Sequence, residues 1–91
     1  MARADLMEAR EYVAERSLSA ADRLLLTIND DIHTLAQQPL MRRERPELRV
    51  GLISWPTSTA YILYYVPDQD GLILVRVLHH ARDIQPLDVF D

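Results

Sequence analysis

The sequence predicts an α+β domain of two layers, in which an N-terminal antiparallel helical hairpin packs on one face of a three-stranded antiparallel sheet. Two observations indicate this fold. Apolar residues recur at helical spacing between residues 3 and 37, with one short break. From residue 48 onward, apolar runs of strand length alternate with short stretches rich in Pro, Asp, Gly, Ser and Thr. We expect the two helices to cover one face of the sheet that these strands form.

The first two elements are predicted to be amphipathic helices. Residues 3–16 carry an apolar stripe with charges on the other faces. The break at residues 17–19 ends with Ser19, which stands three residues before Asp22 in an arrangement close to a capping box. The second helix is therefore expected from about residue 20 to residue 37, and Pro39 ends it. So short a break predicts an antiparallel pair.

Three predicted strands follow a polar connector at residues 40–47. The first runs from about residue 48 to residue 55 and is ended by Pro56. Thr-Ser-Thr at residues 57–59 forms the turn into the second strand, at residues 60–66. Pro-Asp-Gln-Asp-Gly at residues 67–71 is a hairpin turn, and the last strand covers residues 72–80.

Side chains alternate between the two faces of a strand, which predicts what each face carries. In the last strand, we expect Ile73, Val75 and Val77 to pack on the helices. In the first strand, Val50 and Leu52 suit the same core. The open face would then be a recognition surface with these candidate residues: Arg49, Trp55, Arg76, His80 and Arg82.

Several of these candidates have an equally simple structural explanation. Trp55 precedes a proline and is placed to pack at the end of a strand. Arg76 lies within an apolar strand and requires an acceptor, which one of the many carboxylates could supply. His79 and His80 are adjacent in a strand and are expected on opposite faces, which disfavours a shared metal site. We expect no metal and no cofactor.

Composition restricts the functional classes. The chain has 91 residues, which predicts a single domain over residues 1–91, and no cysteine, which excludes disulfides and thiolate chemistry. Its net charge of −4 disfavours binding to a phosphate backbone, because such binding relies on neutralising phosphates. The apolar runs are too short to span a membrane, and no export signal opens the chain, so a cytoplasmic protein is expected.

Several segments, taken in order, resemble the ParE-type toxins of the ParE/RelE superfamily of bacterial toxin–antitoxin pairs. Three segments lie in the helical half: residues 4–17, which begin with Ala-Asp-Leu and end with Glu-Arg-Ser, residues 20–24 (Ala-Ala-Asp-Arg-Leu), and residues 35–39, which begin with Leu-Ala and end with Pro. Three more lie in the strand half: residues 45–49 (Arg-Pro-Glu-Leu-Arg), residues 61–66 (Tyr-Ile-Leu-Tyr-Tyr-Val) and residues 73–83, which include the polar end of the last strand. The resemblance covers most of the chain. It implies a short strand ahead of the first helix, and Met1 stands where that strand would already have ended. Either the native start lies upstream of Met1 or the chain lacks this strand, and for the sequence as it stands we expect the family fold without its usual first strand.

The resemblance also separates two kinds of activity. The RelE branch cleaves messenger RNA with basic side chains and often a C-terminal tyrosine, but this chain has Tyr61 and Ala81 where arginines would be expected and no tyrosine in its tail. The ParE branch is understood to inhibit DNA gyrase by protein binding, without chemistry of its own, and this activity is preferred. The alternatives are an endoribonuclease that uses Arg49, Arg76, His80 and Arg82, or an inactive toxin that only binds an antitoxin.

The resemblance further implies a protein partner. Such toxins are held by a cognate antitoxin, typically ParD-like, whose disordered C-terminal segment folds on the toxin. We expect this segment to lay an amphipathic helix along the helical hairpin. The residues expected to contact it are Tyr12, Leu24, Ile28 and Ile32.

Overall fold

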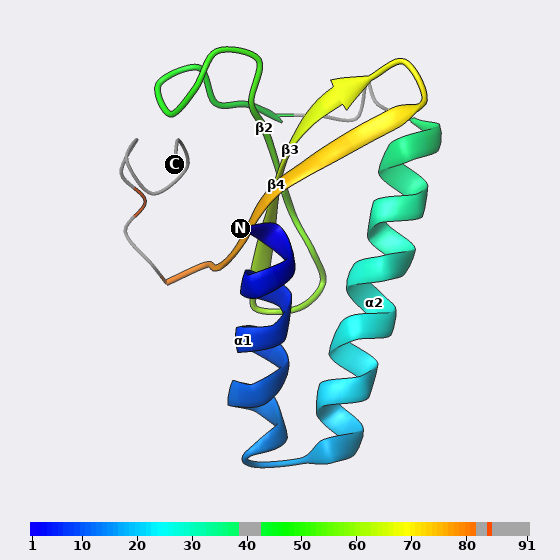
Figure 1. Ribbon diagram of the computed structural model, residues 1–91, viewed down its shortest axis with the longest axis vertical. Helices are drawn as coiled ribbons and strands as arrows, with labels where there is room; N and C mark the ends of the chain where they lie inside the picture. Colours follow the sequence, from blue (N-terminus) through cyan, green and yellow to red (C-terminus); the bar gives the residue numbers. More distant parts are fainter. Residues whose placement is uncertain (39–42, 82–83, 85–91) are drawn as a thin grey trace.

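Two helices precede an antiparallel sheet in the computed structural model, which describes residues 1–38, 43–81 and 84 (Figure 1). The elements are α1 (Ala2–Ala14), α2 (Leu18–Gln37), β1 (Arg43–Glu44), β2 (Ile53–Pro56), β3 (Tyr61–Asp68) and β4 (Gly71–His79). The strand order is β1-β2-β3-β4, and every neighbouring pair is antiparallel. The predicted α+β arrangement is confirmed, and the two-residue β1 is an addition to it.

The helical hairpin forms as predicted, but its second helix begins earlier. Ser17 is the N-cap of α2, with an extended backbone, and its Oγ accepts a hydrogen bond from the backbone N–H of Ala20 at 3.2 Å. The prediction that Ser19 opens the helix is therefore wrong by two residues, because the serine at the break itself satisfies a free N–H of the first turn. Pro39, expected to end the helix, lies outside the described residues.

The predicted first strand is wrong in its first half. Residues 46–51 form turns, and the strand proper starts at Ile53. Backbone hydrogen bonds from Leu48 N to Arg45 O and from Leu52 N to Arg49 O coil this segment, and Gly51 has a φ of +81°. Val50, predicted to be in the core, is consequently 89% exposed.

The hairpin of β3 and β4 closes through Gln69 and Asp70, as the turn residues predict. Gly71 begins β4 with a φ of +138°. A Cβ at this position would lie 3.3 Å from the Cβ of Ala36, near the end of α2. The glycine therefore serves both the turn and the close approach of the turn to α2.

A β-bulge changes which side chains of β4 face the helices. Tyr64 pairs with Arg76 but the next residue, Tyr65, pairs with Leu74, so Val75 is an extra residue in β4. Alternation is reversed across this point. Val77 packs on the helices as predicted, whereas Val75 packs on the opposite side, which corrects the expectation for that residue.

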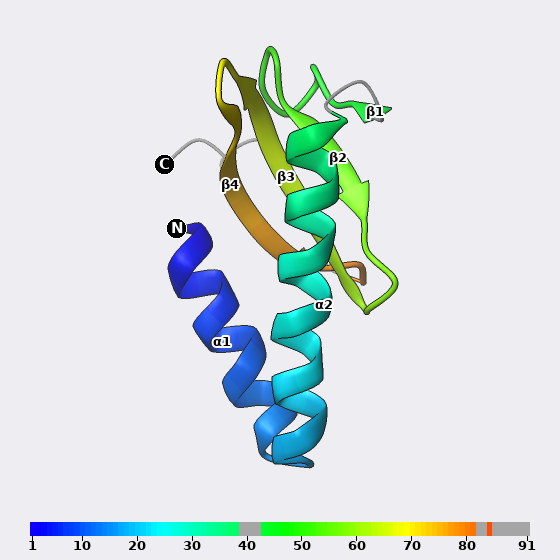
Figure 2. The same ribbon diagram turned by 90° about the vertical axis from the view of Figure 1, so that its right-hand side faces the viewer.

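The sheet is covered on both faces. The core between sheet and helices contains Ala9, Leu24, Ile28, Leu35, Ile53, Tyr61, Leu63, Tyr65 and Val77. A second cluster, of Leu48, Leu52, Tyr64 and Leu78, is formed where the turns at residues 46–51 pack against the other face. The face predicted to be open is therefore largely occupied. Figure 2 shows α2 crossing over the sheet and the helical hairpin extending past it.

Candidate functional site

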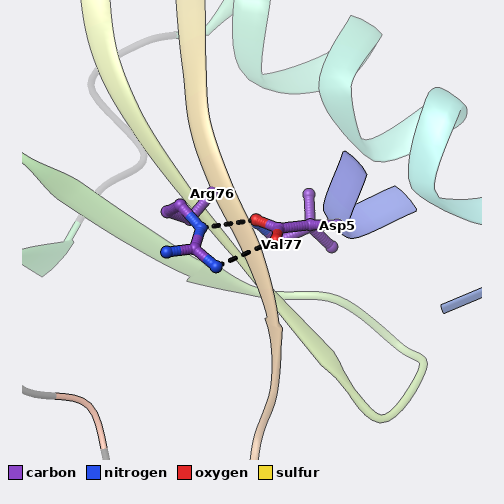
Figure 3. Close-up of polar contacts among 3 residues, drawn as sticks. All are labelled: Asp5, Arg76 and Val77. Atoms are coloured by element: carbon purple, nitrogen blue, oxygen red, sulfur yellow. Dashed lines mark hydrogen bonds and ion pairs between the residues drawn. The ribbon is translucent and has the colours of Figure 1, made fainter. Parts of the chain in front are cut away.

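A buried ion pair joins the start of α1 to β4 (Figure 3). Asp5 accepts two hydrogen bonds from the Arg76 guanidinium, from Nε at 2.7 Å and from Nη2 at 2.9 Å. The same carboxylate accepts the backbone N–H of Val77 at 3.0 Å. The side chains of Arg76 and Asp5 are only 14% and 7% exposed. Asp5 therefore neutralises the arginine and also occupies a backbone donor of β4, the last strand in the sheet order.

This geometry gives Arg76 the structural partner that its place in an apolar strand requires. Arg76 lies opposite Tyr64, on the face turned away from the helices, as alternation predicts. Its guanidinium nevertheless meets a carboxylate from α1. Asp5 was not singled out from the sequence, because charged residues in the first turn of a helix are common and 71 positions separate the two partners.

Two other residues of the predicted recognition surface, Arg49 and Trp55, do not take the strand positions on the open face that the prediction gave them. Arg49 is exposed within the turns that precede β2, and not in a strand. Trp55 is half-buried and packs against the helix-side core, so its expected place on the open face is wrong. Arg82 lies outside the described residues. The first strand was predicted too long, and this error placed Arg49 and Trp55 on a common face.

The two histidines at the end of β4 lie together, contrary to the expectation of opposite faces. The rings of His79 and His80 stack with their centroids 4.6 Å apart. The strand ends at His79, so alternation no longer applies to His80. Within residues 1–38, 43–81 and 84, no three His, Asp or Glu side chains are grouped so that they could hold a metal ion.

An apolar groove of about 540 Å³ runs along the helical hairpin. Its lining residues are Leu6, Asp22, Leu25, Leu26, Ile28, Asn29 and Ile32. Leu26 is 64% exposed, which is a large exposure for a leucine beside an apolar groove. One lining residue comes from α1 and the others come from α2, so the groove lies between the two helices.

The residues expected to meet an antitoxin are divided between this groove and the core. Ile32 lines the groove, Ile28 borders it from the helix-side core with only 1% exposure, and Tyr12 is exposed on α1. Leu24 is buried in the helix-side core, with only 7% exposure, because α2 turns it toward the sheet. Leu25 and Leu26 were missed, although three successive leucines are a signal that α2 is apolar on more than its core face.

Comparison with known proteins assigns the chain to a family. A family model described as the ParE toxin of the type II toxin–antitoxin system parDE matches residues 1–84. A search of curated proteins found no match. No helix in the described part of the chain has the length and apolar character needed to cross a membrane. The match covers nearly the whole sequence, and the chain therefore belongs to the family of ParE toxins of type II toxin–antitoxin systems.

Proposed function

We propose that this toxin inhibits DNA gyrase by protein–protein binding and that a ParD-like antitoxin neutralises it. The observation that carries the proposal is the ion pair of Arg76 with Asp5. An endoribonuclease would use Arg76 to stabilise charge that develops on the scissile phosphate. A guanidinium held by two hydrogen bonds to a buried carboxylate is already neutralised and is poorly placed for that role.

Overall charge and site geometry support the same proposal. The net charge of −4 disfavours a messenger RNA substrate, because phosphate binding draws on a basic surface. The remaining basic candidates of the described residues, Arg49 and His80, stand in different segments, one before β2 and one after β4. A surface that binds another protein requires neither a basic patch nor a converging set of catalytic side chains.

The test of the proposed activity is supercoiling of relaxed plasmid by purified gyrase in the presence of increasing amounts of the toxin. Inhibition that the antitoxin reverses would support a gyrase inhibitor. Full supercoiling by gyrase in the presence of folded toxin would contradict it. In that event, cleavage of messenger RNA by the same preparation, absent from an Arg82→Ala variant, would support an endoribonuclease, and its absence would leave an inactive toxin that binds only an antitoxin.

For the antitoxin, we propose that an amphipathic helix occupies the apolar groove of the helical hairpin. The family implies an antitoxin partner, and the groove offers Leu6, Leu25 and Leu26 to its apolar side chains. Asp22 at the groove and the net charge of −4 favour arginine or lysine beside those apolar anchors.

A matched pair of variants tests the groove. Burying a leucine is worth about 1.5–3 kcal/mol, so Leu26→Asp is expected to weaken the toxin–antitoxin complex by roughly tenfold or more. Leu18→Asp is the control, because Leu18 is equally exposed on α2 but does not line the groove. Isothermal titration calorimetry measures both affinities. Equal affinities of the two variants for the antitoxin would place the antitoxin elsewhere.

A further inference from the structure

A small polar cavity lies where α1 meets β3 and β4. Its volume is about 130 Å³, and its polar lining comes from Asp5, Glu8, Tyr61 and His79. Since one water molecule takes up about 30 Å³ of liquid, this space equals roughly four waters. It has room for the head of one side chain and is too small for a nucleotide or an organic cofactor.

Of the two carboxylates that line the cavity, one has no cationic partner among the described residues. Asp5 is already satisfied by Arg76 and by the backbone of Val77. Glu8 is exposed at the cavity and, among the residues that the structure describes, takes part in no ion pair or hydrogen bond. A carboxylate at the mouth of a partly enclosed site attracts a cation more strongly than one surrounded by water.

Tyr61 contributes a polar group to the same cavity. The residue is only 8% exposed, and within the described part of the chain its hydroxyl makes no hydrogen bond. Burial raises the pKa of Tyr61, the charges of Tyr12 and Glu8 raise it further, and both Tyr61 and Glu8 line the cavity. None of the described residues has a buried side-chain oxygen or nitrogen without a hydrogen bond, so this hydroxyl reaches solvent in the cavity and is accessible to a side chain that enters it.

His79 adds an aromatic wall to the cavity. Its Nδ1 accepts a hydrogen bond from the backbone N–H of Ala81 at 3.1 Å, which leaves the proton of the neutral ring on Nε2. The ring meets that of Tyr61 edge to face, with centroids 5.4 Å apart. The cavity is thus built from a free carboxylate, a free hydroxyl and two aromatic rings.

We propose that this cavity binds the cationic head of an arginine or lysine side chain from the antitoxin. Glu8 forms the ion pair, and the Tyr61 hydroxyl accepts a hydrogen bond from the cation. The Tyr61 ring adds a favourable cation–π contribution. The inference deepens the proposed function by naming a specific contact for the antitoxin, but its test requires neither antitoxin nor gyrase.

The test uses two probes, N-acetyl-arginine amide and the uncharged N-acetyl-citrulline amide, titrated against the toxin while the ring resonances of Tyr61 and His79 are followed by NMR. An ion pair with the exposed Glu8 carboxylate predicts that the arginine probe binds about two- to fivefold more tightly than the citrulline probe. Its bound charge also lowers the pKa of Tyr61, which an ultraviolet titration of the phenol measures.

Three variants make the test specific to the cavity. Glu8→Gln should abolish the preference for arginine, whereas Glu15→Gln, which removes an exposed acid just after α1 and outside the cavity, should retain it. Tyr61→Phe keeps the ring and should weaken the preference. Equal binding of the two probes to the unmodified toxin, or a preference that survives Glu8→Gln, would overturn the proposal. The supercoiling assay is independent of these outcomes.

Discussion

The ion pair between Asp5 and Arg76 leads to a strong prediction for stability. Asp5→Ala leaves the Arg76 guanidinium, 14% exposed, without its carboxylate and removes the acceptor of the Val77 N–H. Breaking one side of a buried ion pair costs about 3–5 kcal/mol. Because Arg76 keeps some solvent contact and further interactions of its own, we expect the lower end, about 3 kcal/mol.

Urea unfolding followed by circular dichroism measures this loss directly. In a chain of this size each 1 kcal/mol lowers Tm by roughly 4–8 °C, so Asp5→Ala should lower Tm by about 12–24 °C. The control is Asp22→Ala, which removes an exposed carboxylate 3.6 Å from Arg10 and should change stability by at most about 0.5 kcal/mol. Adding Arg76→Met to Asp5→Ala should restore part of the loss, because it removes a largely buried charge that has lost its carboxylate.

The explanation fails if Asp5→Ala and Asp22→Ala unfold at the same urea concentration. It also fails if the double variant is as unstable as Asp5→Ala alone. The first result would mean that the carboxylate contributes no more than a surface acid. The second would mean that lost packing, and not the loss of the carboxylate beside the guanidinium, accounts for the effect.

Three further predictions concern local structure. Gly71→Ala should destabilise the fold by about 1–3 kcal/mol in urea unfolding, because φ is +138° and the new Cβ would lie 3.3 Å from that of Ala36; unchanged stability would contradict this. Ser17→Ala should lose about 1 kcal/mol and Ser19→Ala less, since only Ser17 caps α2; equal losses would refute the assignment. Burial raises the pKa of the Tyr61 hydroxyl above its ordinary value of 10.0. Above about pH 10 the unfolded chain therefore releases the hydroxyl proton while the native state still holds it, so the free energy of unfolding should fall as the pH rises past about 10. Tyr61→Phe should remove this added dependence when unfolding is measured between about pH 9 and pH 11.

The arrangement of helices and strands could be predicted because its signals are local. Helical periodicity, the Pro-Asp-Gln-Asp-Gly turn and the apolar strands each depend on neighbouring residues. Errors arose where a local pattern was extended too far. Val50 was assigned to a strand because residues 48–55 are apolar enough for one, whereas the backbone coils through Gly51 and places Leu48 and Leu52 against the far side of the sheet.

The candidate site was harder to predict because it depends on a β-bulge in β4 and on an ion pair between residues far apart in the sequence. The extra residue Val75 in β4 reverses alternation along half the strand, and nothing in an aliphatic run indicates where a bulge falls. The pairing of Asp5 with Arg76 joins opposite ends of the chain. Sequence reasoning correctly required an acceptor for Arg76 but could not choose among fourteen acidic residues.

The carboxylate of Asp5 has a consequence for solubility. β4 is the last strand in the order of the described sheet, and its outward N–H groups are potential templates for a strand of another molecule. By accepting the N–H of Val77, Asp5 closes one of these positions with a charged side chain, and the body of α1 beside it obstructs the approach of a second chain. Loss of this carboxylate would thus expose a site for edge-to-edge aggregation in addition to weakening the fold.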